Sequence, residues 1–316
     1  MKRRMLALAL ASGLLWLAAC GPAVTTGPGP ASAASAAAPA RAPTPGPKPQ
    51  ASSLPATALD RALVPLAGPA PDYAKAAQAL TALTRDPEAP PEAWVHLGVV
   101  LGRLGEREPA LEAFDRAAKA KPKWAAPLVA AADLARRAHD LKRARALAEQ
   151  AVKAEPAAPL AHVALAAALR DARDLDGAAK ALSAALTLDP RSAPALAGLG
   201  LVFLARGDAA AALVVLDRGL AMHAEHADLR ATKGLALRAR GEVAGAAAEY
   251  VRALKADPRH AAAHLALGEI AVANLDYASA EAHFRVALAV QPRDLDAQLG
   301  LARARYGLKD MKGAGE

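Results

Sequence analysis

Apolar side chains between positions 91 and 294 recur in a fixed phase every 34 residues. Small residues occupy the eighth, twentieth and twenty-seventh positions of each unit. Larger apolar residues fill the seventh, twenty-fourth and twenty-eighth positions of most units and the fourth position of some, such as Trp94 and Leu196. A unit of this size cannot bury its own apolar face, so it must stack on its neighbours. The period predicts six stacked units, at 91–124, 125–158, 159–192, 193–226, 227–260 and 261–294.

Proline and glycine keep the same phase as the apolar positions. Prolines stand near the end of five units, at 122, 156, 190, 258 and 292, and Ala224 takes the place of the missing one. Gly105, Gly207 and Gly241 fall in mid-unit, where a left-handed residue can end a helix at little cost. Alanine is very common, at 92 of 316 residues, while aromatic residues make up only 3%. Because alanine fills little volume, this composition favours closely packed helices and an all-α fold.

The unit length and its small-residue sites resemble the tetratricopeptide repeat family, as Gly98, Ala110 and Ala117 of the first unit illustrate. The resemblance covers 91–294 and implies a right-handed superhelical solenoid of antiparallel helix pairs, with a helix A and a helix B in each unit. Residues 56–90 resemble a degenerate unit with a weak first helix, in which Asp72 and Tyr73 start helix B. Residues 295–316 are expected to form a capping helix or partial repeat.

That last segment has two parts in this interpretation. We expect a helix A over 295–308, whose polar residues Arg303, Arg305 and Lys309 cover the end of the solenoid. Residues 310–316 are expected to begin a second, shortened helix.

Three positions depart from the pattern. Ala131 and Ala148 stand in the second unit where large residues are usual, which predicts a thinner core there. Lys233 occupies a leucine site of the fifth unit.

The first residues carry an export pattern. Positions 2–4 are basic, 5–19 are almost wholly apolar, and the run ends in Leu17-Ala18-Ala19-Cys20. The apolar run is too short for a spanning helix and fits a signal peptide over 1–19. The small residues before the cysteine resemble the lipobox of bacterial lipoproteins, which implies cleavage before Cys20 and a covalent lipid on it. An ordinary cleaved signal with a chance cysteine and an uncleaved anchor are the alternatives.

Residues 20–55 are rich in Pro, Ala, Gly and Ser without an apolar period, and we expect a disordered linker there. The formal net charge of +8 includes five basic residues at 2–4, 41 and 48, which leaves about +3 for the folded part. The charges are also interspersed. The basic pI of the whole chain therefore does not indicate a nucleic-acid surface.

The resemblance also implies where a partner would bind. In such solenoids, positions 2, 5, 9, 12 and 13 of helix A line a concave groove. Apolar residues at these positions are Val95, Val99, Val129, Val163, Leu201, Leu204, Leu235, Leu265 and Val272. Arginines that border them are Arg103, Arg136, Arg137, Arg170 and Arg238. We expect this groove to bind an apolar peptide or helix whose acidic groups pair with the arginines. The alternative is that neighbouring units simply bury these residues in part.

Other chemistry has little support in the sequence. The Lys and Asn residues of the carboxylate clamp found in some chaperone-linked relatives are absent from positions five and nine. His260 and His264 have a spacing that can place two metal ligands on one helix, but no third ligand is evident. No nucleophile elbow or phosphate loop occurs, so we expect neither an enzyme, a metal site, a small-molecule substrate nor a cofactor other than the lipid on Cys20.

Together these features predict a monomeric protein-interaction scaffold that is tethered to the bacterial envelope and binds components of envelope complexes. Gly21 after the cysteine favours the outer membrane, facing the periplasm, although the inner membrane or surface exposure is also possible. An assembly factor for a secretin-type pore of pili or secretion, similar to pilotins, is the alternative. An adaptor for peptidoglycan enzymes is a further one.

Overall fold

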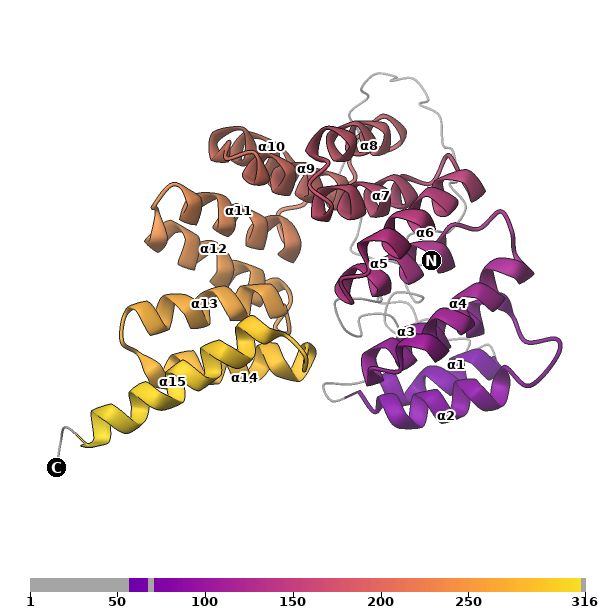
Figure 1. The fold of residues 1–316 in the computed structure, drawn as a ribbon, viewed down its shortest axis with the longest axis horizontal. Coiled ribbons are helices and arrows are strands. Elements are labelled where there is room, and N and C mark those ends of the chain that lie inside the picture. The colour runs from indigo at the N-terminus through magenta and orange to yellow at the C-terminus, as the bar shows by residue number, and fades with distance from the viewer. Residues whose placement is uncertain (1–56, 68–70, 314–316) are drawn as a thin grey trace, which may run out of the picture.

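The computed structural model describes residues 57–67 and 71–313, and each secondary-structure element within them is a helix (Figure 1). Successive helices form antiparallel pairs, which confirms the predicted all-α solenoid. The pairs are α1 (Ala58–Leu63) with α2 (Tyr73–Leu83), α3 (Pro91–Leu104) with α4 (Arg107–Ala120), α5 (Ala126–Arg137) with α6 (Leu141–Ala154), α7 (Pro159–Asp171) with α8 (Leu175–Leu188), α9 (Ala193–Ala205) with α10 (Ala209–Met222), α11 (Ala227–Ala239) with α12 (Val243–Ala256), and α13 (Ala261–Ala273) with α14 (Tyr277–Val290). A 3₁₀ turn, η1 (Val64–Leu66), follows α1, and α15 (Leu295–Gly313) ends the stack.

The second helix of most pairs begins at an aspartate. In each case the carboxylate accepts a hydrogen bond from the backbone N–H three residues later, which satisfies a donor that the helix itself leaves open. The capping residues are Asp72, Asp140, Asp174, Asp208 and Asp276. In these five pairs a single polar residue fixes where helix B starts, whereas Glu106 and Glu242, at the same position before α4 and α12, make no such hydrogen bond.

The residue before the N-cap position of helix B adopts a left-handed conformation in all six full units. Gly105, Gly207 and Gly241 hold it with φ near +85°, as the sequence predicts. The same position in the other three units is filled by residues with a side chain: His139, Arg173 and Leu275, with φ of 59°, 65° and 61°. The conformation of the turn is therefore imposed by the packing of the helix pair and not by glycine alone.

In four of the units a glycine of helix A lies against a large side chain of helix B. A Cβ atom placed on Gly98 would lie 2.6 Å from Cε1 of Phe114, and one on Gly268 would lie 2.7 Å from Cε1 of Phe284. Both rings are buried. Glycine at the eighth position of the unit thus lets the large side chain at the twenty-fourth position lie directly against the backbone of helix A.

Two departures from the pattern are accommodated in different ways. In the second unit the buried Ala131 and Ala148 leave space that Leu147 of α6 helps to fill, since it packs against three neighbouring clusters. In the fifth unit the Lys233 ammonium group lies 2.7 Å from Asp217 and 4.0 Å from the buried Glu249.

The last helix differs from the prediction. α15 continues without a break from Leu295 to Gly313, so the expectation of a second helix beginning at 310 is wrong for the described residues. Gly307, which could have signalled a turn, instead packs on the ring of Tyr277, where an added Cβ would lie 2.5 Å from Cε1. Arg305 turns back to pair with Glu281 at 2.9 Å.

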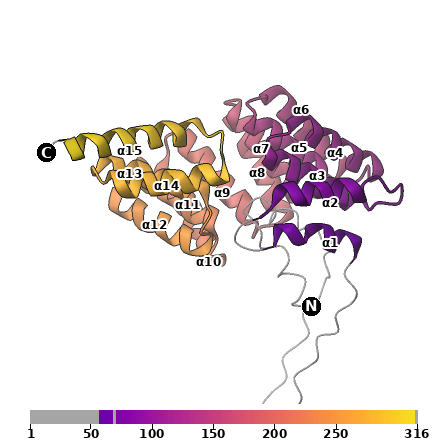
Figure 2. The same ribbon diagram turned by 90° about the horizontal axis from the view of Figure 1, so that it is seen from below.

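The stack curves strongly. Helices α1–α8 form one arm and α10–α15 the other, and the curve brings the turn between α14 and α15 back towards the first units (Figures 1 and 2). The two arms approach each other beside Gly105, where an added methyl group would lie 3.2 Å from Nη2 of Arg293. First helices of the units face the inside of this curve, which is where a site shared by several units can form.

Candidate functional site

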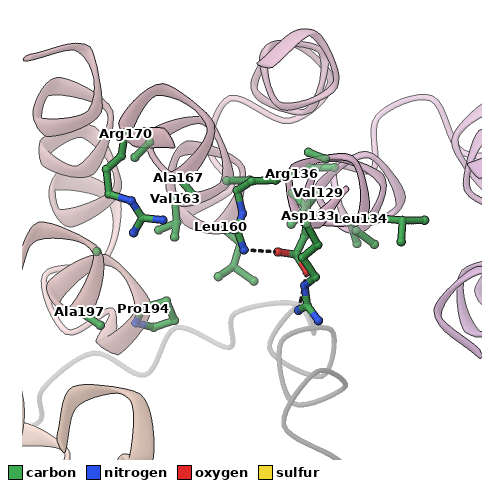
Figure 3. A pocket seen from close by; sticks show the side chains of 18 of the residues that line it. Val129, Asp133, Leu134, Arg136, Leu160, Val163, Ala167, Arg170, Pro194 and Ala197 are labelled. Atoms are coloured by element: carbon green, nitrogen blue, oxygen red, sulfur yellow. Dashed lines mark hydrogen bonds and ion pairs between the residues drawn. The ribbon is translucent and has the colours of Figure 1, made fainter. Parts of the chain in front are cut away.

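A cavity of about 420 Å³ lies on the inside of the curve. Its walls come mainly from α3, α5, α7, α9 and α11, the first helices of five successive units. Figure 3 shows the apolar part of this wall, where Val129, Leu160, Val163, Pro194 and Ala197 face the space. Each helix contributes residues three, four or seven positions apart, because that spacing places side chains on one face.

The predicted groove residues divide into two groups. Those that line the cavity are Val99, Arg103, Val129, Arg136, Arg137, Val163, Arg170 and Leu201. Those that do not are Val95, Leu204, Leu235, Arg238, Leu265 and Val272. Val95 is buried in the core against the first unit's own helix B, and Leu204, Leu235, Leu265 and Val272 pack against core clusters of their own units. For these five residues the structure agrees with the alternative interpretation, in which packing within the solenoid buries the predicted groove residues in part.

Most of the cavity arginines are already ion-paired within the chain. Arg136 donates to Asp133 at 2.8 Å and to Asp171 at 3.1 Å, so it joins α5 to α7. Arg137 pairs with Asp133 at 2.6 Å, and Arg170 pairs with Asp171 at 2.8 Å. Outside the cavity, Arg238 pairs with Glu269 of the next unit. Arg136 and Arg238 therefore connect adjacent units, while Arg137 and Arg170 pair with carboxylates of their own helices.

The ion pairs keep both aspartates charged. Burial on its own would raise the pKa of Asp133, but the guanidinium groups of Arg137 and Arg136 lower it below the usual value. Burial likewise opposes ionisation of Asp171, and Arg170 and Arg136 outweigh it, so that its pKa is also lowered. The pKa of Arg136 is raised, because the two carboxylates outweigh the effect of burial on the guanidinium.

Sequence reasoning missed these acidic partners, although a local signal for one was present. Asp133 lies three residues before Arg136 and four before Arg137, a spacing that favours ion pairs on a helix. Asp171 could not be found this way, because its bond to Arg136 crosses from one unit to the next.

Arg103 differs from the other cavity arginines. It is half-buried at the end of α3 and, in the part of the chain that the structure describes, makes no ion pair. Burial lowers the pKa of its guanidinium group, and the positive charges of Arg137 and Arg259 lower it further. Four arginines and two aspartates, Asp133 and Asp228, line the cavity, so its walls carry a positive charge.

The two closely spaced histidines do not share a site. Nδ1 of His260 accepts from the backbone N–H of Ala263, and its Nε2 donates to Asp228 at 3.0 Å. His264 instead meets His283, with 2.9 Å between their Nδ1 atoms. No three His, Cys, Asp or Glu side chains within 57–67 and 71–313 come together in an arrangement that could hold a metal ion.

Two points concern the membrane. None of the described helices has both the length and the apolar content that crossing a bilayer requires. Cys20, the predicted lipid attachment site, lies outside the described residues.

Comparison with known proteins identifies the repeat. Sequence models of one family, described as tetratricopeptide repeat, match residues 61–123, 129–193, 231–288 and 265–316, and a second model with the same description matches 169–236. Together they cover more than half of the chain. No curated protein matches it.

Solved structures with the same fold include a tetratricopeptide repeat protein from Parabacteroides merdae, which is 17% identical over 74% of this chain and 93% of that one, with a TM-score of 0.58. The APC/C hetero-tetramer Cut9-Hcn1 is 17% identical over 77% of this chain and 49% of that one, with a TM-score of 0.54. A thermophilic repeat protein of Thermus thermophilus is 25% identical over 54% of this chain and 93% of that one, with a TM-score of 0.48.

Proposed function

Because the chain belongs to the tetratricopeptide repeat family, we propose that it is an envelope scaffold that binds a segment of another protein in the cavity on the inside of its curve. The fold is that of a protein-interaction scaffold, and proteins of this family are in general not enzymes. The proposal adds to this a place of binding, a class of ligand and a membrane tether.

The composition of the cavity supports binding of a peptide or helix. Its apolar residues come from successive units, so they form a row along the stack and not a single compact pocket. Extended inner surfaces of this kind suit chain segments, which can place one side chain against each unit. The single observation that carries the proposal is this row of accessible apolar residues, among them Leu160, Ala167 and Leu201, beside charged side chains.

The tether rests on the sequence. A basic start, an apolar run over 5–19 and small residues before Cys20 favour export followed by lipid attachment. Lipid chains on the amino-terminal cysteine would hold the protein at a membrane, and we propose the periplasmic side of the outer membrane. Two predictions name the envelope complex that would be bound. One is a secretin-type pore during its assembly, and the other is a complex that contains peptidoglycan enzymes.

A test of the binding site should spare the ion pairs. Reversing the charge of Arg136, Arg137 and Arg170 would leave Asp133 and Asp171 without partners, so a loss of binding could reflect damage to the fold. Ala167→Trp instead fills the cavity from α7. Ala146→Trp is the matched control, because Ala146 is exposed on α6 and does not line the cavity.

We expect crosslinking followed by mass spectrometry of membranes to recover the same partner with the unaltered protein and with Ala146→Trp, and to lose it with Ala167→Trp. Equal recovery with a folded Ala167→Trp variant would rule out the cavity as the binding site. For the tether, Cys20→Ser should move the protein out of the membrane fraction. Retention of that variant in the membrane would contradict lipid anchoring.

A further inference from the structure

The outer face of α15 carries an apolar stripe that the other described residues leave exposed. The helix packs on α13 and α14 through its opposite face, where Ala304 is fully buried. Leu295, Leu299 and Tyr306 are 75%, 52% and 69% exposed. Together with the exposed Ala302 they follow one another at intervals of four, three and four residues, which places all of them on one side of the helix. We call these four residues the end stripe.

The end stripe is the stacking face of the repeat, left open where the stack ends. Leu299 and Ala302 are the fifth and eighth residues of this last helix A. In the six full units the fifth residue is buried or half-buried, and the eighth is buried. Val95 and Gly98 of the first unit show the cause, since both pack with Phe114 of helix B. Within the described residues α15 has no helix B, so the same face remains uncovered.

The polar residues that were expected to cover this end leave the stripe open. Arg305 turns back to Glu281 of α14, at 2.9 Å. Arg303 and Lys309 are exposed and form no ion pair with another described residue. An apolar stripe rimmed by unpaired charges is typical of an interaction surface.

We propose that a second copy of this chain covers the end stripe, with its α15 antiparallel to the first. A two-fold axis then relates the copies, and the same surface serves on both sides. In the register that matches the apolar positions, Leu299 of each copy packs on Ala302 of the other, and Leu295 packs on Tyr306. Ala302 thus meets a large side chain of an antiparallel neighbour, as the glycine at this position does in four full units.

Charge complementarity favours a second copy and fixes the antiparallel direction. Asp296 and Arg303 lie on the same flank of the end stripe, seven residues apart, and neither has an ion-pair partner among the described residues. Equivalent flanks of two antiparallel helices face each other, so Asp296 of each copy lies beside Arg303 of the other. In a parallel pair, Arg303 would face the uncharged Gln298 instead. Only the antiparallel arrangement therefore forms two symmetric ion pairs.

This pairing does not depend on the proposed function, because the residues of the end stripe do not line the cavity. A pair of chains would carry two cavities, one in each copy. The monomer expected from the sequence would then be one half of the working assembly.

Sedimentation equilibrium of the purified full chain tests the pairing, in detergent with micelles in large excess so that two copies rarely share one. We expect a reversible equilibrium between monomer and dimer. Leu299→Glu places a charge at the centre of the interface and should leave the protein monomeric. Its circular dichroism melt should be unchanged, because Leu299 is 52% exposed in the single copy. Val214→Glu is the control and should dimerise like the unaltered protein, since Val214 is 72% exposed on α10, away from α15 (Figure 1).

A charge swap tests the antiparallel register. Asp296→Arg or Arg303→Asp alone replaces two attractive contacts with two repulsive ones, and should raise the dissociation constant of the dimer about tenfold. The double variant Asp296→Arg/Arg303→Asp restores opposite charges at both contacts. Its dissociation constant should return to within about threefold of the unaltered value.

Three results would overturn the proposal. One is a chain that stays monomeric at every concentration tested, or a dimer that survives Leu299→Glu. Another is a double charge variant that dimerises no more tightly than the single variants, which would rule out the antiparallel register. The third is a different protein that copurifies in equal amount with the unaltered chain and is lost from Leu299→Glu, because that protein and not a second copy would cover the end stripe.

Discussion

The guanidinium group of Arg293 lies against Gly105, although the two residues belong to the sixth and the first full unit. Contacts in a solenoid are normally confined to neighbouring units. Here the curve of the stack carries the last turn back to the first one, and the inner cavity is lined by helices from α3 of the first unit to α11 of the fifth. A ligand in this cavity can therefore touch units that are far apart in the sequence.

Leu275→Gly should stabilise the protein. Leu275 has φ of 61°, a left-handed conformation that costs a residue with a side chain about 1 kcal/mol, and its side chain is 63% exposed, so little buried surface is lost. We expect a gain of about 1 kcal/mol from urea unfolding followed by circular dichroism. Leu188→Gly is the control, because Leu188 is also exposed but helical, and there glycine should cost about 1 kcal/mol. Equal changes in unfolding free energy for the two variants would contradict the claim that the left-handed conformation of Leu275 is strained.

Gly268→Ala should destabilise the protein, since the new methyl group would lie 2.7 Å from the buried ring of Phe284. Overpacking of this kind costs about 1–3 kcal/mol. In Gly245→Ala the methyl group meets only Leu237, at 3.5 Å, and should be neutral or stabilising. Unfolding midpoints of the two variants test the prediction. A Gly268→Ala variant as stable as Gly245→Ala would show that the ring does not rest on the helix backbone.

Glu249→Ala should be strongly destabilising. The carboxylate of Glu249 is only 6% exposed and accepts from Arg230 at 3.0 Å and from Arg252 at 2.6 Å. Its loss leaves Arg230, itself 15% exposed, without its buried partner, and breaking a buried pair typically costs about 3–5 kcal/mol. The exposed pair of Glu112 and Arg116 provides the comparison: Glu112→Ala should cost less than about 1 kcal/mol. Urea unfolding measures both variants, and equal losses of unfolding free energy would mean that the buried ion pairs of Glu249 stabilise the protein no more than an exposed pair.

Stability should fall as the pH drops below about 6.5. Burial lowers the pKa of His96, His226 and His283 from the usual 6.5, so the unfolded chain binds more protons than the folded one in this range. The stability present above pH 6.5 is then lost as the pH falls towards the folded pKa values. Asp133 and Asp171, whose pKa values are lowered, lose their contribution only at more acidic pH.

Urea midpoints at pH 7.5 and 5.5 measure this effect. We expect a lower midpoint at pH 5.5, and a smaller difference between the two pH values when His96, His226 and His283 are all replaced by Gln. The same midpoint at both pH values would contradict the pKa shifts.

The repeat itself was predictable from sequence because its packing is local. Gly98 and Phe114 belong to one unit, so their fixed spacing reports a contact that recurs in the fourth, fifth and sixth units. The cavity depends instead on how the units curve. Val129 and Leu265 occupy the same position of their units, yet only Val129 lines the cavity. Curvature arises from contacts between units, such as that of Arg136 with Asp171, and a single unit's pattern does not contain them.

Site-specific photocrosslinking tests the central claim most directly. A photoreactive amino acid at Leu160 lies within the cavity, and one at Val214, which is 72% exposed on α10, lies outside it. In intact cells the account predicts a crosslink to another protein from position 160 and none from position 214. A partner that crosslinks from position 214 and not from position 160 would contradict it.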